Sequence, residues 1–196
     1  MPDSTSHTVV AVVLQVRQGR LVPIVRRVDR GPAEPLETAL ARAIDVAALA
    51  HVEQLETRVL RDGTLATAYL GLVPADADAP DETDDLAPDE SELVTAAHAR
   101  LRAKLSYTNV AFALAPETFT ISELREIYVP ALGHDVSATN LQRVLVRRGV
   151  LARVEGRRAP GRTGGRPAAL YRFASRRLEI TDEFAALRPP GSRATG

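Results

Sequence analysis

Hydrophobic residues near the N-terminus form two runs separated by a turn. Val9 to Leu14 predicts a buried strand, and Leu21 to Val28 predicts a returning strand, because both runs are rich in β-branched residues. Gln18-Gly19-Arg20 between them is typical of a tight turn. From Leu36 to Leu49, apolar residues recur at three- and four-residue spacing, which predicts a helix with Pro35 acceptably near its start.

A second hairpin is predicted after this helix. Val52 to Leu60 and Thr64 to Val73 have the composition of strands, and Arg61-Asp62-Gly63 joins them. Asp-Gly between two apolar runs is a strong hairpin signal because glycine accepts a positive φ. Residues 8–73 are therefore predicted to fold as strand, strand, helix, strand, strand.

Helical periodicity dominates the second half of the chain. Leu93 to Leu105 predicts an amphipathic helix. A further helix start is marked by Thr120 and Glu123, which have the spacing of a capping box, and by Phe119 and Leu124, which have the spacing of a hydrophobic staple. Both signals predict that a helix begins directly after Thr120.

A turn and another helix follow. Pro130 is expected to disrupt the helix that begins after Thr120, and Gly133-His134-Asp135 to form the turn. Ser137 can cap a helix from Ala138 to Arg148, which Gly149 ends. A helix, a glycine-containing turn and a second helix are the parts of a helix-turn-helix.

The residue pattern of this last helix indicates DNA binding. Its apolar residues fall on one side, and its other side carries side chains that can contact base edges. These predicted contacts are Thr139, Asn140, Arg143 and Arg147, with Gln142 added from the same segment. The alternative is an exposed amphipathic helix that is merely solvated.

A basic hairpin is predicted next. Val150 to Val154 and Ala168 to Phe173 predict the two strands of a wing. The loop between them adds four predicted DNA contacts: Arg157, Arg158, Arg162 and Arg166. Its tip, Gly164-Gly165-Arg166-Pro167, is small enough to enter an A·T-rich minor groove, although a generic nucleic-acid contact is the alternative.

The formal net charge of zero is a cancellation between segments. Residues 1–73 hold 8 basic and 8 acidic side chains, residues 74–92 hold 9 acidic and no basic ones, and residues 93–196 hold 17 basic and 8 acidic ones. The middle segment is expected to be a flexible acidic linker, either a solvated spacer or an autoinhibitory competitor for the basic part. Residues 93–175 then form the DNA-binding domain, and residues 176–196 a partly disordered tail.

Composition excludes several classes of protein. The chain has 45% hydrophobic and 26% charged residues, which is ordinary for a globular protein. It has no cysteine, its four histidines are scattered, and no apolar stretch is long enough to span a bilayer. We therefore expect no metal site, no membrane contact and a cytoplasmic location.

Four segments together resemble one family. The segments are Leu105-Ser-Tyr-Thr-Asn-Val-Ala-Phe-Ala-Leu, Phe119-Thr-Ile-Ser-Glu-Leu-Arg-Glu-Ile-Tyr128, Asn140-Leu-Gln-Arg143 and Gly165-Arg-Pro-Ala-Ala-Leu-Tyr-Arg-Phe173. They are similar to the winged-helix domain of the Nudix-related transcriptional regulators (NrtR). The resemblance implies an α+β chain with an N-terminal Nudix-like domain and a C-terminal winged helix. It also implies a dimeric bacterial regulator, often a repressor, of NAD-related or sugar-utilisation genes that responds to ADP-ribose or a relative.

The first 73 residues depart from the Nudix hydrolase pattern. With Glu34 at the first glutamate of the signature, Arg42 falls on its arginine, but Ala43, Val46 and Ala47 occupy the remaining carboxylate positions. Those carboxylates bind Mg²⁺ in the hydrolases, and alanine and valine cannot. We therefore expect no enzyme activity and no resident cofactor in this truncated, degenerate domain, which can serve mainly for dimerisation.

Nucleotide sensing has few candidate residues in this domain. Arg26, Arg27 and Arg42 are the candidate phosphate contacts, and Tyr69 is the one candidate for stacking on an adenine. The leading hypothesis is a homodimeric regulator that binds a double-stranded DNA operator. The alternatives are a non-specific nucleic-acid or nucleoid-binding protein and, less favoured, a Nudix hydrolase.

Overall fold

The computed structural model describes residues 6–158 and 167–182 of the chain. The N-terminal part is a four-stranded sheet in the order β2-β1-β4-β3. Its strands are β1 (His7–Arg17), β2 (Arg20–Asp29), β3 (His51–Val59) and β4 (Leu65–Leu72). β1 pairs antiparallel with β2 and parallel with β4. The two predicted hairpins are confirmed, and Gln18 and Gly19, with φ of 50° and 74°, form the first turn.

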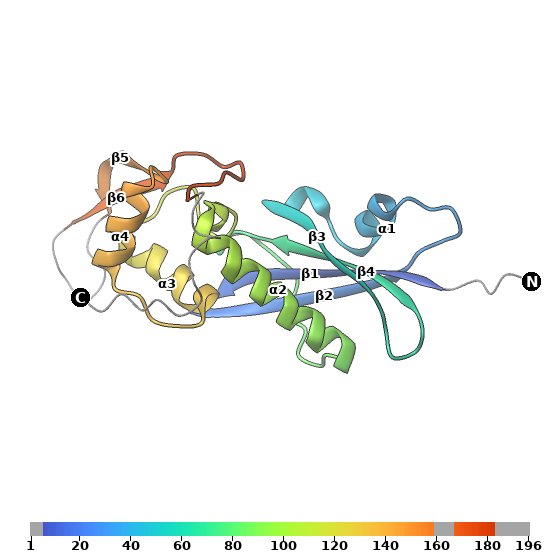
Figure 1. Cartoon of the computed structure of the whole chain (residues 1–196). Coiled ribbons are helices and arrows are strands. Elements are labelled where there is room, and N and C mark those ends of the chain that lie inside the picture. Colours follow the sequence, from blue (N-terminus) through green and yellow to red (C-terminus); the bar gives the residue numbers. More distant parts are fainter. Residues whose placement is uncertain (1–5, 159–166, 183–196) are drawn as a thin grey trace, which may run out of the picture.

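Opposite faces of the sheet are covered by different helices. The side chains of Val9 and Ala11 pack with α1 (Leu36–Ala43), whereas Val10 and Val12 belong to the core that includes α2 (Pro88–Tyr107). Because successive side chains of β1 point to opposite faces of the sheet, the strand packs against a helical layer on each face. Figure 1 shows α1 and α2 on either side of the strands, with α2 running toward the C-terminal helices.

The predicted helix over 36–49 is shorter than expected. α1 ends at Ala43, Ile44 is extended, and Val46–Ala48 form a separate 3-10 turn. The carboxylate of Asp45 accepts a hydrogen bond from the backbone N–H of Ala47 at 3.0 Å. A side-chain cap of this kind starts a new turn and competes with continuation of α1.

The acidic segment also differs from the expectation of a free spacer over 74–92. α2 begins at Pro88, so residues 88–92 are helical. Residues 74–87 have no helix or strand, but they are bound to β1 and β2. The buried amide of Gln15 donates to the carbonyls of Pro74 and Ala77, both at 2.8 Å, because a buried amide needs acceptors. The division of the chain into domains stays a prediction.

The C-terminal part consists of three short elements and a hairpin. These are a 3-10 turn (Val110–Ala113), α3 (Ile121–Leu132), α4 (Ala138–Arg147), β5 (Leu151–Arg158) and β6 (Ala168–Phe173). α3 continues past Pro130, contrary to the sequence expectation. Tyr128 and Ala131 are buried on either side of Pro130, so packing outweighs the one hydrogen bond that proline removes.

One continuous core joins the sheet to the C-terminal helices. The buried face of α2 contributes Leu93, Ala97, Leu101 and Leu105 to a cluster that also contains residues of β1, β4, α3, α4 and β6. Residues 175–182 add a contact that the sequence did not indicate. The side chain of Asn109 donates to the carbonyl of Arg177 at 2.8 Å and accepts from the N–H of Glu179 at 2.8 Å.

Glu53 links β3 to α2 and gives the first testable prediction. Its carboxylate lies 2.8 Å from Lys104, 3.3 Å from Arg100 and 3.2 Å from His51. Burial would raise the pKa of Glu53, but the hydrogen bond and charge of Lys104, followed by those of His51, lower it below the ordinary value of 4.5. Glu53→Gln should reduce the free energy of unfolding at pH 7 by about 1 to 3 kcal/mol, because it removes charged hydrogen bonds.

The pH dependence of this effect has a definite sign. A lowered folded-state pKa stabilises the protein above the unfolded pKa, and this contribution is lost as pH falls through the folded pKa. Urea unfolding should therefore show the difference between wild type and Glu53→Gln at pH 7 and a smaller one below about pH 4. Glu117→Gln, at an exposed loop position, is the control. An equal effect of both substitutions would contradict the prediction.

Candidate nucleic-acid interface

The start of α3 fixes the helix-turn-helix. Thr120 Oγ1 accepts from the N–H of Glu123 at 3.2 Å, and the Glu123 carboxylate accepts from the N–H of Thr120 at 2.7 Å. Phe119 and Leu124, the staple positions, are both fully buried. The predicted capping box is confirmed, and it sets where α3 begins.

The turn after α3 is held by a glycine and an arginine. Gly133 ends α3 with a φ of 73°, in the left-handed region that favours glycine. Arg125 Nε, on α3, donates to the carbonyl of Val136 at 2.8 Å, and its guanidinium also bonds Asp135. Ser137 then accepts from the N–H of Asn140 at 3.2 Å and caps α4 as predicted. These bonds determine the direction in which α4 leaves the turn.

α4 has one buried and one exposed side. Leu141 and Leu145 are buried in the shared core. The four residues predicted to contact bases are all exposed: Thr139, Asn140, Arg143 and Arg147. Arg143 Nη2 donates to Asn140 Oδ1 at 2.9 Å, so two of these side chains form one polar unit on the surface. The structure brings the four together, and their contact with DNA stays a prediction.

Gln142 lies elsewhere. Its side chain is half-buried, and its amide donates to the hydroxyl of Tyr171 at 3.0 Å. Tyr171 lies on β6, and its backbone forms a two-hydrogen-bond bridge with Phe119. Gln142 therefore joins α4 to the wing in the free protein, rather than standing on the exposed face.

The wing is bent by a bulge that the sequence pattern did not indicate. β5 and β6 shift register between Val154 and Arg157, where Gly156 has a φ of 101°. Arg157 is exposed, whereas Arg158 pairs with Glu123 and also donates to the carbonyl of Thr118. Arg158 thus holds the wing against the start of α3.

The remaining wing predictions fall partly outside the described residues. Arg162, Arg166 and the first three residues of the predicted minor-groove tip over 164–167 lie there. Two further exposed arginines, Arg153 on β5 and Arg172 on β6, add positive charge to the hairpin. The sequence signal for them was the run of 11 basic residues against one acidic residue from 143 to 177. Such a surface has salt-dependent affinity for phosphates.

The predicted ligand residues of the N-terminal part are not gathered into one site. Arg26 and Tyr69 both pair with Ala11 and share its face of the sheet, but Arg27 pairs with Val10 and points to the opposite face. Arg26 and Arg27 therefore lie on opposite faces of the sheet, and the contact of either one with a phosphate stays a prediction. Arg42 donates to the carbonyl of Asp29 at 2.7 Å and lies 3.4 Å from Glu34.

Two of the three substituted Nudix carboxylate positions lie beyond the end of α1. Ala43 is the last residue of α1, and Val46 and Ala47 lie in the separate 3-10 turn. The neighbouring cavity, lined in part by Ile44, Leu49 and Pro80, has a volume of about 60 Å³. Within residues 6–158 and 167–182, no three His, Cys, Asp or Glu side chains are grouped so that they could hold a metal ion.

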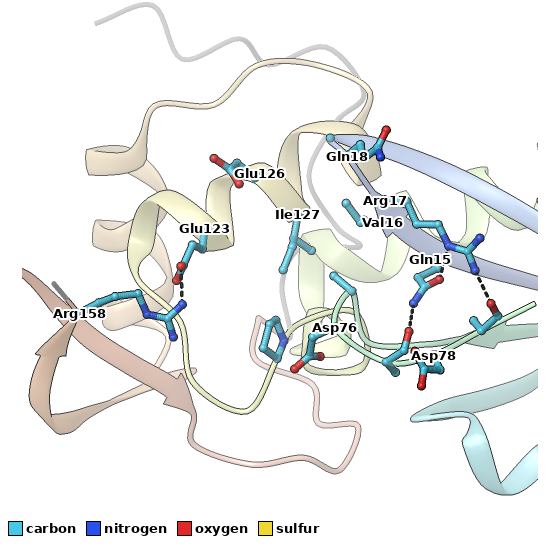
Figure 2. Close-up of a pocket in the computed structure, with 15 residues that line it drawn as sticks. Gln15, Val16, Arg17, Gln18, Asp76, Asp78, Glu123, Glu126, Ile127 and Arg158 are labelled. Atoms are coloured by element: carbon cyan, nitrogen blue, oxygen red, sulfur yellow. Dashed lines mark hydrogen bonds and ion pairs between the residues drawn. The ribbon is translucent and has the colours of Figure 1, made fainter. Parts of the chain in front are cut away.

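A larger cavity of about 680 Å³ lies between the sheet and the C-terminal part. Figure 2 shows the β1–β2 turn and residues 75–79 on one side, and α3 with Arg158 on the other. Asp76 and Asp78 of the acidic segment line it together with Glu126 and Arg158. In this structure, side chains of β1 and the backbone of β2 hydrogen-bond to residues 74–83, and the N–H of Ala75 donates to the carbonyl of Leu114 in the C-terminal part at 2.9 Å.

The helix-turn-helix followed by a two-stranded wing defines a winged-helix domain. Residues 111–173 match the NrtR DNA-binding winged helix domain, so this part of the chain is similar to the winged helix of that family. A relative from Acinetobacter baylyi (strain ATCC 33305 / BD413 / ADP1), named ADPR responsive transcriptional repressor NtrR, is 39% identical over 90 residues, which are 46% of this chain. The match spans 35% of that relative's length.

Solved structures support the fold of most of the chain. Shewanella oneidensis NrtR, complexed with a 27mer DNA, has a TM-score of 0.66 and 22% identity over 85% of this chain and 92% of its own. A MutT/nudix family protein from Enterococcus faecalis has a TM-score of 0.64 and 16% identity over 89% and 90%. The α+β fold with a Nudix-like N-terminal part and a winged helix is confirmed. Among the helices in the described ranges, none has the length and apolar character needed to cross a membrane.

The cap of α3 gives the second prediction. Thr120→Ala should lower the free energy of unfolding by about 1 kcal/mol, because the N–H of Glu123 loses its side-chain acceptor. Thr139→Ala, at an exposed position in the first turn of α4, should change it by less than about 0.5 kcal/mol. Urea denaturation of both variants measures the difference. Equal losses would show that the Thr120 hydroxyl does not cap α3.

Proposed function

We propose that this chain is a sequence-specific DNA-binding transcriptional regulator that acts as a repressor of NAD-related or sugar-metabolism genes. The observation that carries the proposal is the exposed row on α4, which consists of Thr139, Asn140, Arg143 and Arg147. It combines an amide, a hydroxyl and two guanidinium groups on a helix whose opposite side is fixed in the core. The name of the Acinetobacter baylyi relative supports repression as the sign of regulation.

The chemistry of the row favours base recognition over phosphate binding alone. An asparagine amide can pair with adenine and an arginine with guanine through two hydrogen bonds each. Asn140 and Arg143 are already within hydrogen-bond distance of each other, so one can orient the other at the base edge. The exposed arginines of the wing then supply affinity for the backbone without sequence information.

The assembly that fits this role is a homodimer. A two-fold dimer presents two copies of α4 to successive major-groove half-sites, which doubles the number of bases recognised. We place the dimer contact in the N-terminal sheet part, whose net charge over residues 1–73 is zero. The location that follows from this role is the bacterial cytoplasm, where the DNA lies.

The N-terminal part is proposed to be non-catalytic. Ala43, Val46 and Ala47 offer no ligand to Mg²⁺, and α1 ends before two of these three positions. ADP-ribose is the first effector to test, since the Acinetobacter baylyi relative is named for its response to it. Arg26 and Tyr69 share a face of the sheet, so they are the residues that such a nucleotide would contact together.

The third prediction tests base recognition. DNA selected from a random pool by the wild type should contain a two-fold-symmetric sequence, and Asn140→Ala or Arg143→Ala should lose about 1 to 3 kcal/mol of discrimination at one base pair. Arg20→Ala, an exposed arginine of the β1–β2 turn, is the matched control and should keep full discrimination. A small, uniform loss of affinity for all sequences in the two α4 variants would instead indicate a non-specific nucleic-acid binder.

The fourth prediction tests the absence of hydrolase chemistry. Purified protein with Mg²⁺ should release no AMP from ADP-ribose or NADH, because Ala43, Val46 and Ala47 replace the carboxylates that bind Mg²⁺ in the hydrolases. Chromatography of the nucleotide products over hours measures this, with a Nudix hydrolase of known activity as the positive control. Mg²⁺-dependent turnover that disappears with a chelator would refute the non-catalytic assignment.

A further inference from the structure

A second cavity lies beside α4. It has a volume of about 310 Å³ and is lined by the end of α2, by α3, by α4, by the turn before α4 and by Asp182. Its apolar walls are Leu105, Leu132, Val136, Leu141, Val144 and Leu145. This volume is at the lower end of small-molecule sites. The cavity is separate from the 680 Å³ cavity beside the β1–β2 turn, and the two have no lining residue in common.

Two buried polar groups of the cavity lining lack hydrogen-bond partners. Tyr128 is 4% exposed, and its hydroxyl has no partner. Arg148, whose side chain is 10% exposed, has an unpartnered Nε, although its Nη2 donates to the carbonyl of Ser106 and lies 3.8 Å from Asp182. A buried donor without an acceptor costs free energy, and in native structures such groups often await a ligand or water.

The two groups call for the same kind of ligand atom. Burial raises the pKa of Tyr128, so its hydroxyl stays protonated and can donate. Arg148 Nε–H is a charged donor. An oxygen of an anionic group can accept from both. The charged groups of the lining are Arg147, Arg148 and the carboxylate of Asp182, so the lining has a net positive charge that favours an anion over a cation.

We propose that this cavity binds a small organic monoanion, whose apolar body packs against the leucine and valine walls and whose anionic group accepts hydrogen bonds from Tyr128 and Arg148. The same cavity is lined by Asn140 and Arg147, two of the residues assigned above to DNA contact. Occupancy therefore changes the surroundings of the exposed row on α4. This link to DNA binding rests on the proposed function, but ligand binding itself does not.

The experiment uses the full chain and 8-anilinonaphthalene-1-sulfonate, a fluorescent probe with apolar rings and one sulfonate. Fluorescence titration of the wild type should show saturable binding of one probe per chain. Val144→Phe fills the cavity and should weaken binding at least tenfold. Val146→Phe is the matched control, because Val146 lies on the same helix, is 50% exposed and does not line the cavity. It should bind the probe as the wild type does.

Tyr128→Phe separates a binding role from a structural one. It should weaken probe binding about fivefold while leaving the thermal midpoint of the free protein unchanged or raised, because it removes an unpaired buried hydroxyl. A lowered midpoint with unchanged probe affinity would show that the hydroxyl is structural and would overturn its assignment. Absent or non-saturable binding in the wild type, or equal affinity in Val144→Phe and Val146→Phe, would overturn the site.

The coupling to DNA is measured separately. Saturating probe should change the affinity of the wild type for its selected DNA at least threefold and leave Val144→Phe unaffected. Probe binding without any change in DNA affinity would overturn the coupling but support the site. Probe binding by a protein that selects no DNA sequence would support the site and refute the proposed function.

Discussion

Burial of β1 on both faces is the constraint on which the rest of the structure depends. Residues Thr8 to Val16 are all buried, so each face of the strand needs a covering layer. α1 supplies one layer and α2 with the C-terminal helices supplies the other. Gln15 is a buried polar residue in this apolar strand, so its side-chain amide needs hydrogen-bond partners from the protein rather than from water. It finds them in Pro74 and Ala77, and this anchors the acidic segment at the end of the sheet.

Local signals in the sequence were sufficient to predict most elements. The Gln18-Gly19 turn, the Thr120 and Glu123 cap and the Ser137 cap depend on contacts within four residues, and all three are present. The early end of α1 coincides with a local cap by the Asp45 carboxylate, which the apolar pattern did not show. The other wrong prediction about a helix depends on distant partners. The helical continuation of α3 through Pro130 is maintained by burial of Tyr128 and Ala131, and no local pattern reports that burial.

In the candidate site too, features set by local sequence could be predicted, whereas contacts between distant residues could not. Period 3.6 placed Thr139, Asn140, Arg143 and Arg147 on one exposed side, but it could not show that Gln142 is committed to Tyr171, 29 residues away. Similarly, the basic composition of the wing did not reveal the pairing of Arg158 with Glu123. The two-residue period of a strand does imply that the neighbouring residues Arg26 and Arg27 face opposite sides of the sheet, as their pairing with Ala11 and Val10 shows.

The length of α2 has a consequence for modularity. Its buried residues cover the sheet at one end and reach the winged helix at the other, so the boundary between the two parts runs along a helix rather than through a loop. Figure 1 shows this helix bridging both parts. A cut on either side of α2 would leave an apolar face of one fragment uncovered. The winged-helix part and the Nudix-like sheet therefore share one hydrophobic core, and neither can be exchanged for another module without redesigning that helix.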